Sequence, residues 1–339
     1  MIQIEELPEL HDPVMICAFE GWNDAGEAAS RLVGHLASLW DAEIVAAIDP
    51  EDYYDFQVNR PRVTNQGQGR GIHWDTTRIM LASPDSLGRD VILVVGTEPS
   101  FRWRAYTTEI LDLAASHGVR TVITLGALLS DVPHSRPIPV SCTSDDEATA
   151  YRFDLEPARY EGPTGITGVV ADGARQAEMA SIAVWAEIPH YAAQVPCPKA
   201  TLAMLVRLED LLDTVIDHDD LEDEAQAWER GVDELARTDE DVADYVSALE
   251  SAQDTTELPE ASGDAIAKEF ERYLRRRGDG SPARADPTLL PLRPLPPAAL
   301  PWANTDQRPR LTHFPREMRT TAPSRRISLG KSQLRATFP

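Results

Sequence analysis

Two short segments far apart in the chain carry side chains that could act as acids, bases or metal ligands. The segment SDVPHS contains Asp131 and His134, and the later segment IPHY contributes His190. A carboxylate and two imidazoles that meet in space could form a catalytic or a metal-binding cluster. The sequence has no H-x-x-H or H-E-x-x-H spacing, so we predict no metal site. A His beside a Pro is also typical of a structural residue, and that alternative stays open.

A second set of charged side chains lies in the segment GTEPSFRWR. Glu98 and Arg102 follow an apolar run there, and Arg104 comes shortly after. Arginine side chains near a loop could hold the carboxylate or phosphate of a substrate. The structural alternative is an internal ion pair that orients the loop.

The third set, FEGWNDAG at residues 19–26, follows the apolar run at 14–19 and precedes a helical pattern. Asp24 could be a general base or ligand, but an Asp at the start of a helix is typical of an N-cap, as is Asn23. Trp22 is either a contact residue or an ordinary buried ring, since Trp is frequent at protein interfaces. We count all three as candidate binding residues.

No motif identifies a nucleotide or a nucleophile. GQGRG lacks the Lys-Ser/Thr of a P-loop, and GPTGITG lacks the G-x-G-x-x-G spacing. A G-x-S-x-G nucleophile elbow is also missing from the sequence. We therefore predict no cofactor, and the motifs leave any catalytic residue unknown.

The candidate residues follow apolar runs that read as strands, and helical patterns come after them. The predicted strands are 14–19, 43–48, 90–96, 119–126, 166–170 and 180–187, with a hairpin from 53–63 and 71–83 at the sheet edge. The predicted helices reach to about residue 40 and cover 103–117, 172–179 and 199–216. This alternation predicts an α/β fold with a doubly wound, mostly parallel sheet. The carboxyl ends of its strands would bring the candidate loops to one edge.

Composition divides the chain into three predicted parts. Residues 1–218 form the α/β core domain, and residues 219–280 form an extension of acidic helices. Between residues 209 and 260 there are twenty acidic side chains and two arginines, which either form a solvated face or bind a basic partner. Residues 281–339 contain eleven prolines without apolar periodicity, so we predict disorder. The abrupt change in composition is also what an altered reading frame after about residue 280 would produce.

The formal net charge of −24 argues against nucleic-acid and anionic-membrane partners, because phosphate contacts require clustered Lys and Arg. The three cysteines form no C-x-x-C pair, and the first residues lack a basic region followed by an apolar one. No apolar run has the length that a membrane span requires. These features predict a cytoplasmic protein.

Five stretches in this order resemble the proteasome assembly chaperone family, in the actinobacterial branch akin to the second chaperone subunit. They are FEGWNDAG (19–26), GTEPSFRWR (96–104), LGALLSDVPHSRP (125–137), YEGPTGITG (160–168) and IPHYAAQVPCPKATLAML (188–205). The resemblance covers about residues 1–277. It implies a fold like that of nucleoside phosphorylases, a homo-oligomer of trimeric size, and binding to proteasome core particles through their α subunits. The last residues, TFP, depart from the hydrophobic-Tyr-any ending by which related chaperones dock.

We therefore predict a non-enzymatic, chaperone-like protein that binds protein partners through the strand-end loops and the acidic helices. The alternative is a small-molecule enzyme on the same scaffold, either an ATP-dependent carboxylate-amine ligase or a phosphorylase or hydrolase. A third interpretation assigns the polar loops to subunit packing in a homo-oligomer.

Overall fold

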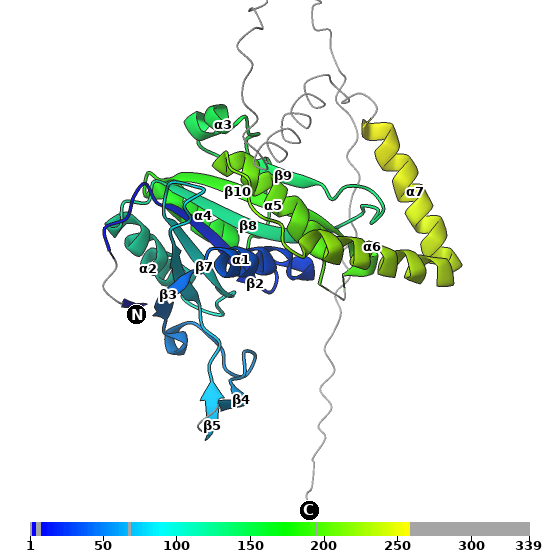
Figure 1. Cartoon of the computed structure of the whole chain (residues 1–339). Coiled ribbons are helices and arrows are strands. Elements are labelled where there is room, and N and C mark those ends of the chain that lie inside the picture. The colour runs from blue at the N-terminus through cyan, green and yellow to red at the C-terminus, as the bar shows by residue number, and fades with distance from the viewer. Residues whose placement is uncertain (1, 5–7, 67–68, 194–195, 258–339) are drawn as a thin grey trace, which may run out of the picture. The chain divides into compact units, whose positions relative to one another are not determined.

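The computed structural model describes residues 2–4, 8–66, 69–193 and 196–257 (Figure 1). The strands are β1 (Ile2–Ile4), β2 (Val14–Glu20), β3 (Glu43–Ile48), β4 (Arg62–Gln66), β5 (Gly69–His73), β6 (Arg78–Ala82), β7 (Val91–Thr97), β8 (Thr121–Ser130), β9 (Val140–Thr143) and β10 (Ala180–Pro189). The α-helices are α1 (Ala28–Leu39), α2 (Trp103–Ser116), α3 (Glu147–Phe153), α4 (Ile166–Gln176), α5 (Pro198–Leu212), α6 (Leu221–Thr238) and α7 (Glu240–Glu257), and the short 3-10 helices are η1 (Ala25–Glu27), η2 (Pro50–Asp52) and η3 (His190–Ala192). The chain divides into units 1–282 and 283–339, and every described element belongs to the first. The predictions for residues 281–339 fall outside the described residues.

Eight strands form one sheet in the order β1-β3-β6-β7-β2-β8-β10-β9. The four strands β7, β2, β8 and β10 pair in parallel, and β3 runs in the same direction, whereas β1, β6 and β9 are antiparallel to them. The predicted α/β fold with a doubly wound, mostly parallel sheet is therefore confirmed. Strands β2 and β3 follow each other in the sequence with α1 between them, but they are not neighbours in the sheet, because β6 and β7 lie between them.

The sheet has an apolar cluster on each face because successive side chains of a strand point to opposite sides. In β2 the residues of one parity join the cluster under α1 and α5, and those of the other parity join the cluster under α2 and α4. The first set is Val14, Ile16 and Ala18, and the second is Met15, Cys17 and Phe19. Burial on both faces explains why β2 is a continuous apolar run rather than an alternating one.

Residues 166–170 form the first turns of α4, so the predicted strand there is wrong. The β-branched residues in this stretch favour a strand, but packing decides the outcome. Ile166, Val170 and Ala174 are buried at four-residue spacing, which places them on one side of a helix. That side packs against α2. The helix continues to Gln176, where the sequence predicted a separate helix from residue 172.

The predicted hairpin is present but its extent differs. Strands β4 and β5 pair only with each other, while β6 enters the main sheet between β3 and β7. Residues 53–61 are not a strand, because the backbone oxygen of Tyr53 accepts hydrogen bonds from the amides of Ser100 and Phe101 after β7. The Tyr53 side chain is fully buried. This turn therefore supports the loop that carries Glu98.

In the predicted extension of acidic helices, the structure contains α6 and α7, and residues 258–280 of that extension lie outside the described residues. Leu221, Trp228 and Val232 of α6 are buried and belong to the same apolar cluster as α1 and α5. Helix α7 packs on α6 and has Val246 buried. None of the helices in the described residues has the length and apolar character needed to cross a membrane. The domain boundary at residue 218 stays a prediction.

Candidate interaction surface at the strand-end loops

A buried polar contact joins the loop after β2 to the loop after β7. The side-chain amide of Asn23 donates to Glu98 Oε1 at 2.8 Å, and the backbone N–H of Ile166 donates to the same oxygen at 2.8 Å. Asn23 is fully buried and Glu98 is half-buried. Glu98 therefore fixes two loops and the first turn of α4, and this carboxylate is already engaged by the protein itself.

The approach of α4 to this contact requires a glycine. Gly165 is the N-cap residue of α4, and a Cβ at this position would overlap the side-chain oxygen of Asn23. The absence of a side chain lets the helix start directly above the Asn23 and Glu98 pair. The Gly-rich run at 162–168 thus has a packing role at its centre.

Asp24 caps α1. Its two carboxylate oxygens accept hydrogen bonds from the amides of Ala29 at 2.7 Å and Ser30 at 3.1 Å. Burial raises the pKa of Asp24, and the hydrogen bonds from Ser30 and Ala29 oppose that rise. Asp24 thus satisfies amide groups that the first turn of α1 leaves free, as a capping side chain does, whereas the N-cap position itself is occupied by Glu27.

Trp22 lies between these buried partners but is 65% exposed. Asn23 accepts a hydrogen bond at its backbone oxygen from the amide of Ala127 in β8 at 2.8 Å, so the loop is joined to the neighbouring strand as well. Beyond Ala127, Leu128 and Leu129 are 41% and 51% exposed. A further exposed apolar ring, Phe101, follows β7. Apolar side chains from the loops after β2 and β7 and from the last residues of β8 are therefore open to solvent, and we call Trp22, Phe101, Leu128 and Leu129 the apolar edge.

Arg102 does not contact Glu98. It binds the carboxylate of Asp52 at 2.7 Å, and its guanidinium lies over the ring of Tyr53 at 5.6 Å. The structural alternative is therefore the better description of Arg102, because the side chain ties the helix start of α2 to η2. An exposed ion pair of this kind contributes little to stability.

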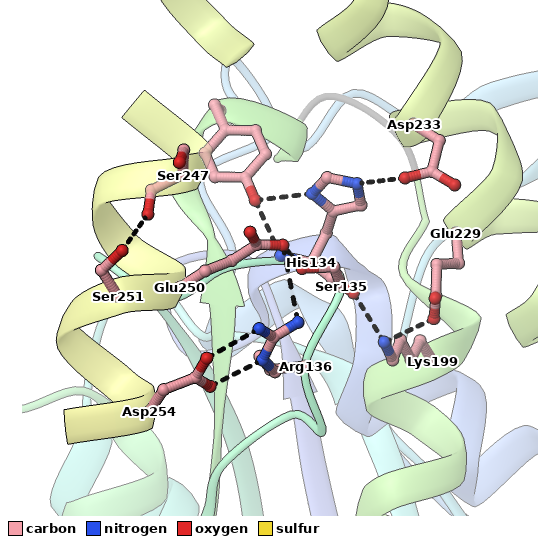
Figure 2. A network of polar contacts seen from close by, with 11 residues as sticks. His134, Ser135, Arg136, Lys199, Glu229, Asp233, Ser247, Glu250, Ser251 and Asp254 are labelled. Atoms are coloured by element: carbon pink, nitrogen blue, oxygen red, sulfur yellow. Dashed lines mark hydrogen bonds and ion pairs between the residues drawn. The ribbon is translucent and has the colours of Figure 1, made fainter. Parts of the chain in front are cut away.

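His134 lies in the loop after β8 and is buried, with 1% of its surface exposed (Figure 2). Its Nδ1 is 2.8 Å from the Tyr191 hydroxyl, which also accepts the His134 backbone N–H, and its Nε2 is 3.1 Å from the Asp233 carboxylate. Burial raises the pKa of Tyr191 to about 12, so this hydroxyl is protonated at neutral pH. The arrangement joins the β8 loop to η3 and α6.

Asp131 and His190 meet at the exposed side of the same region. The carboxylate of Asp131 accepts a hydrogen bond from the Tyr245 hydroxyl at 3.0 Å and lies 3.4 Å from His190 Nδ1. The rings of His190 and Tyr191 both pack edge-on against Tyr245 of α7. Asp131 and His190 thus contact each other, whereas the third sequence candidate, His134, binds Tyr191 and Asp233 instead.

Two basic side chains complete the contacts of the acidic helices, as Figure 2 shows. Arg136 donates two hydrogen bonds to Asp254 at 2.8 and 2.9 Å, and Lys199 lies 2.5 Å from Glu229. These bonds, with that of His134, form what we call the helix-fastening network. Part of the acid excess in α6 and α7 therefore pairs with the core.

The polar side chains described above at this edge bind other groups of the protein. Among the residues that the structure describes, no group of three His, Cys, Asp or Glu side chains could hold a metal ion. Burial raises the pKa of Cys197 to about 11, so its thiol is protonated at neutral pH. The edge exposes the apolar side chains of Trp22, Phe101, Leu128 and Leu129, and the buried polar side chains beside them hold loops.

The sequence interpretation missed several residues of this region. The predicted strand ended at residue 126, whereas β8 continues to Ser130 and exposes Leu128 and Leu129 where it extends beyond its pairing with β2. Arg136 and Lys199 had no local signal, because their partners lie 118 and 30 residues away. The available clue was the opposite charge of these basic residues and the acidic helices.

The fold and the edge define an α/β protein that exposes apolar side chains at the carboxyl ends of its strands. A sequence profile of the PAC2 family matches residues 18–236, and the chain belongs to this family. A PAC2 family protein from Streptomyces avermitilis is 51% identical over 69% of this chain and all of its own, with a TM-score of 0.66.

A proteasome-assembly chaperone homologue from Mycobacterium tuberculosis is 45% identical over 69% of this chain and 99% of its own, with a TM-score of 0.63. PbaB of Pyrococcus furiosus, an archaeal proteasome activator, is 19% identical over 69% of this chain and 98% of its own, and its TM-score of 0.57 shows a shared fold. A search of curated proteins found no significant match.

Proposed function

We propose that this protein is a non-enzymatic, chaperone-like protein of the cytoplasm that binds other proteins through the apolar edge. The observation that carries the proposal is Trp22, a large side chain that is 65% exposed on a loop held by buried polar contacts. A rigid loop that presents an exposed Trp binds at a low entropy cost, and Trp is frequent among the residues that dominate interface energy.

The partners we propose are the α subunits of proteasome core particles, with the protein acting as a homotrimer. Support comes from the relative described as a proteasome-assembly chaperone homologue, which shares 45% of its residues over the matched length. The binding site would consist of the apolar edge, with Asn23, Asp24 and Glu98 holding its loops in place.

Co-purification with proteasome α subunits at moderate salt tests this function. The wild-type protein should retain α subunits, and Trp22→Ala should lose most of them. Tyr151→Ala is the matched control, because Tyr151 is also an exposed aromatic residue, at 92%, and lies in α3. The Trp22 variant should unfold within about 0.5 kcal/mol of the wild type, since its ring is mostly in solvent. Failure of the wild-type protein to retain α subunits would refute the proposal.

The enzyme alternative keeps one structural argument, because the carboxyl edge of an α/β sheet is a common ligand site. At this edge, however, Asn23, Asp24 and Glu98 bind backbone groups or each other. A thermal-shift titration with ATP would revive the ligase alternative. A ligand at 100 times its dissociation constant adds about 2.7 kcal/mol to the free energy of unfolding.

A further inference from the structure

The hairpin of β4 and β5 carries an apolar face that nothing in the described residues covers. Val63 and Ile72 lie directly opposite each other in the two strands and are 56% and 62% exposed. Trp74 follows the end of β5 and is 42% exposed. Its ring packs edge-on against Phe56 with ring centroids 4.6 Å apart. We call the surface formed by Phe56, Val63, Ile72 and Trp74 the ribbon face.

The ribbon gains little support from the rest of the protein. β4 and β5 pair only with each other, and in Figure 1 the two strands extend away from the main sheet on the side of β3. A two-stranded hairpin without a second layer is only marginally stable in water. An exposed apolar cross-strand pair on such a hairpin is therefore a surface suited to a partner.

The charge of the ribbon is opposite to that of the protein. Residues 56–74 contain three arginines and no Asp or Glu, in a chain with a net charge of −24. Arg62 pairs with Asp75 at 2.7 Å. Arg60 and Arg70 are exposed, and the described part of the chain contains no ion-pair partner for either. The ribbon face thus has an apolar centre and a basic rim.

A complementary surface lies at the junction of α6 and α7. Leu235 is 51% exposed near the end of α6. Exposed acidic side chains surround it in the sequence: Glu234, Asp239, Glu240, Asp241 and Asp244. Among these, Glu234 pairs with Arg237 at 3.1 Å. The junction therefore exposes one large apolar side chain and several acidic ones, a composition opposite in charge to the ribbon face.

We propose that the ribbon face of one copy docks on the α6/α7 junction of a second copy of this chain. Val63 and Ile72 would pack against Leu235, while Arg60 and Arg70 would face the acidic side chains of the junction. Within one copy the ribbon joins β3 to β6 at one side of the sheet, whereas α6 packs on α5 above the strands of the other half. The two surfaces therefore meet between copies.

Such a contact is head-to-tail, because it uses two different surfaces, and a head-to-tail contact builds a ring when its rotation closes. The proposed contact names the surfaces through which the proposed homo-oligomer would form. It rests on the proposed function only for the number of copies in the ring. Charge complementarity favours a second copy of the chain as the partner of the ribbon face, because the chain itself carries an acidic surface.

Sedimentation velocity across a concentration series measures the self-association. Arg70→Glu should raise the dissociation constant about tenfold, because it places a like charge opposite the acidic side chains of the junction. Ile72→Thr should also weaken the assembly while it keeps the β-branched shape that suits a strand. Arg104→Glu is the matched control, since this exposed arginine lies in α2 and should leave the assembly unchanged.

The decisive variant combines Arg70→Glu with Asp244→Arg, which exchanges the two charges. The exchange should restore the assembly that each single substitution weakens. A wild-type monomer, unchanged assembly of Arg70→Glu and Ile72→Thr, or no rescue by the exchange would each overturn the proposal. If the ribbon variants Arg70→Glu and Ile72→Thr kept their assembly but lost binding to proteasome α subunits, the proposal would also be overturned. The ribbon would then bind another protein.

The two proposals fail independently in this design. Trp22→Ala should lose α-subunit binding and keep its sedimentation coefficient. The ribbon variants should lose assembly and keep direct binding of α subunits at the apolar edge.

Discussion

Two polar networks lie at the same edge of the sheet, and their side chains bind different kinds of partner. Asn23, Asp24 and Glu98 bind backbone amides or each other, and they hold together the loops after β2 and β7 and the starts of α1 and α4. The helix-fastening network, with His134 and Arg136, binds carboxylates on α6 and α7 over long sequence distances.

This difference predicts different behaviour. Buried hydrogen bonds to backbone groups are insensitive to salt, and losing one partner leaves a buried polar group unsatisfied. Charged pairs near the surface are screened by salt and weakened when their carboxylates are protonated. The first network should therefore hold the apolar edge whatever the salt concentration. The second should hold the acidic helices less firmly at high salt or when its carboxylates are protonated.

The largest effect should come from Glu98→Ala. The substitution leaves the amide of Asn23 and the backbone N–H of Ile166 without their acceptor, so we expect a loss of about 2–4 kcal/mol in the free energy of unfolding. Urea denaturation measures this loss. Glu98→Gln is the control, because it keeps an acceptor oxygen and should cost clearly less; equal losses would show that charge rather than hydrogen bonding matters here.

His134→Ala should cost about 2–3 kcal/mol, since it removes a buried ring and its two polar contacts. Hydrogen exchange should show faster opening of α6 than of α1. Asp233→Asn keeps an acceptor oxygen opposite the ring and should cost less than about 1 kcal/mol. Uniform loss of protection in α1 and α6 would contradict the separation of the two networks.

Arg136→Ala should release α7 locally, with an effect of about 1 kcal/mol or less because the pairs to Asp254 are near the surface. Exchange at α7 amides should rise in the variant, and 0.5 M NaCl should produce the same change in the wild type. The matched control is Arg159→Ala, which removes an exposed pair with Glu156 far from α7. An equal response of both variants would remove the basis for the network.

Lowering the pH should weaken the helix-fastening network before it weakens the contacts of Asp24 at the start of α1. The hydrogen bonds from Arg136 lower the pKa of Asp254, so its stabilising contribution is present above the ordinary Asp pKa and is lost as pH falls through the lowered value. Burial raises the pKa of Asp24, so its contribution is instead lost as pH rises. At about pH 3.5, hydrogen exchange corrected for intrinsic rates should therefore show α7 opening before the α1 start.

Local features of the fold were predictable because their causes are local. The apolar runs of β2, β7 and β8 indicate buried strands, and the position of Asp24 before a helical pattern indicates a cap. The strand prediction at residues 166–170 failed because β-branched residues suit both states, and only the packing of Ile166 on α2 selects the helix.

The sequence by itself determined the α/β class, the acidic helices and the loops that carry the candidate residues, because periodicity and capping act within a few residues. Tertiary structure alone decided which candidates meet. Glu98 binds Asn23 rather than Arg102, and His134 binds Asp233 across 99 residues of chain. Such pairs depend on the strand order, which places β2 between β7 and β8 and brings distant loops to one edge.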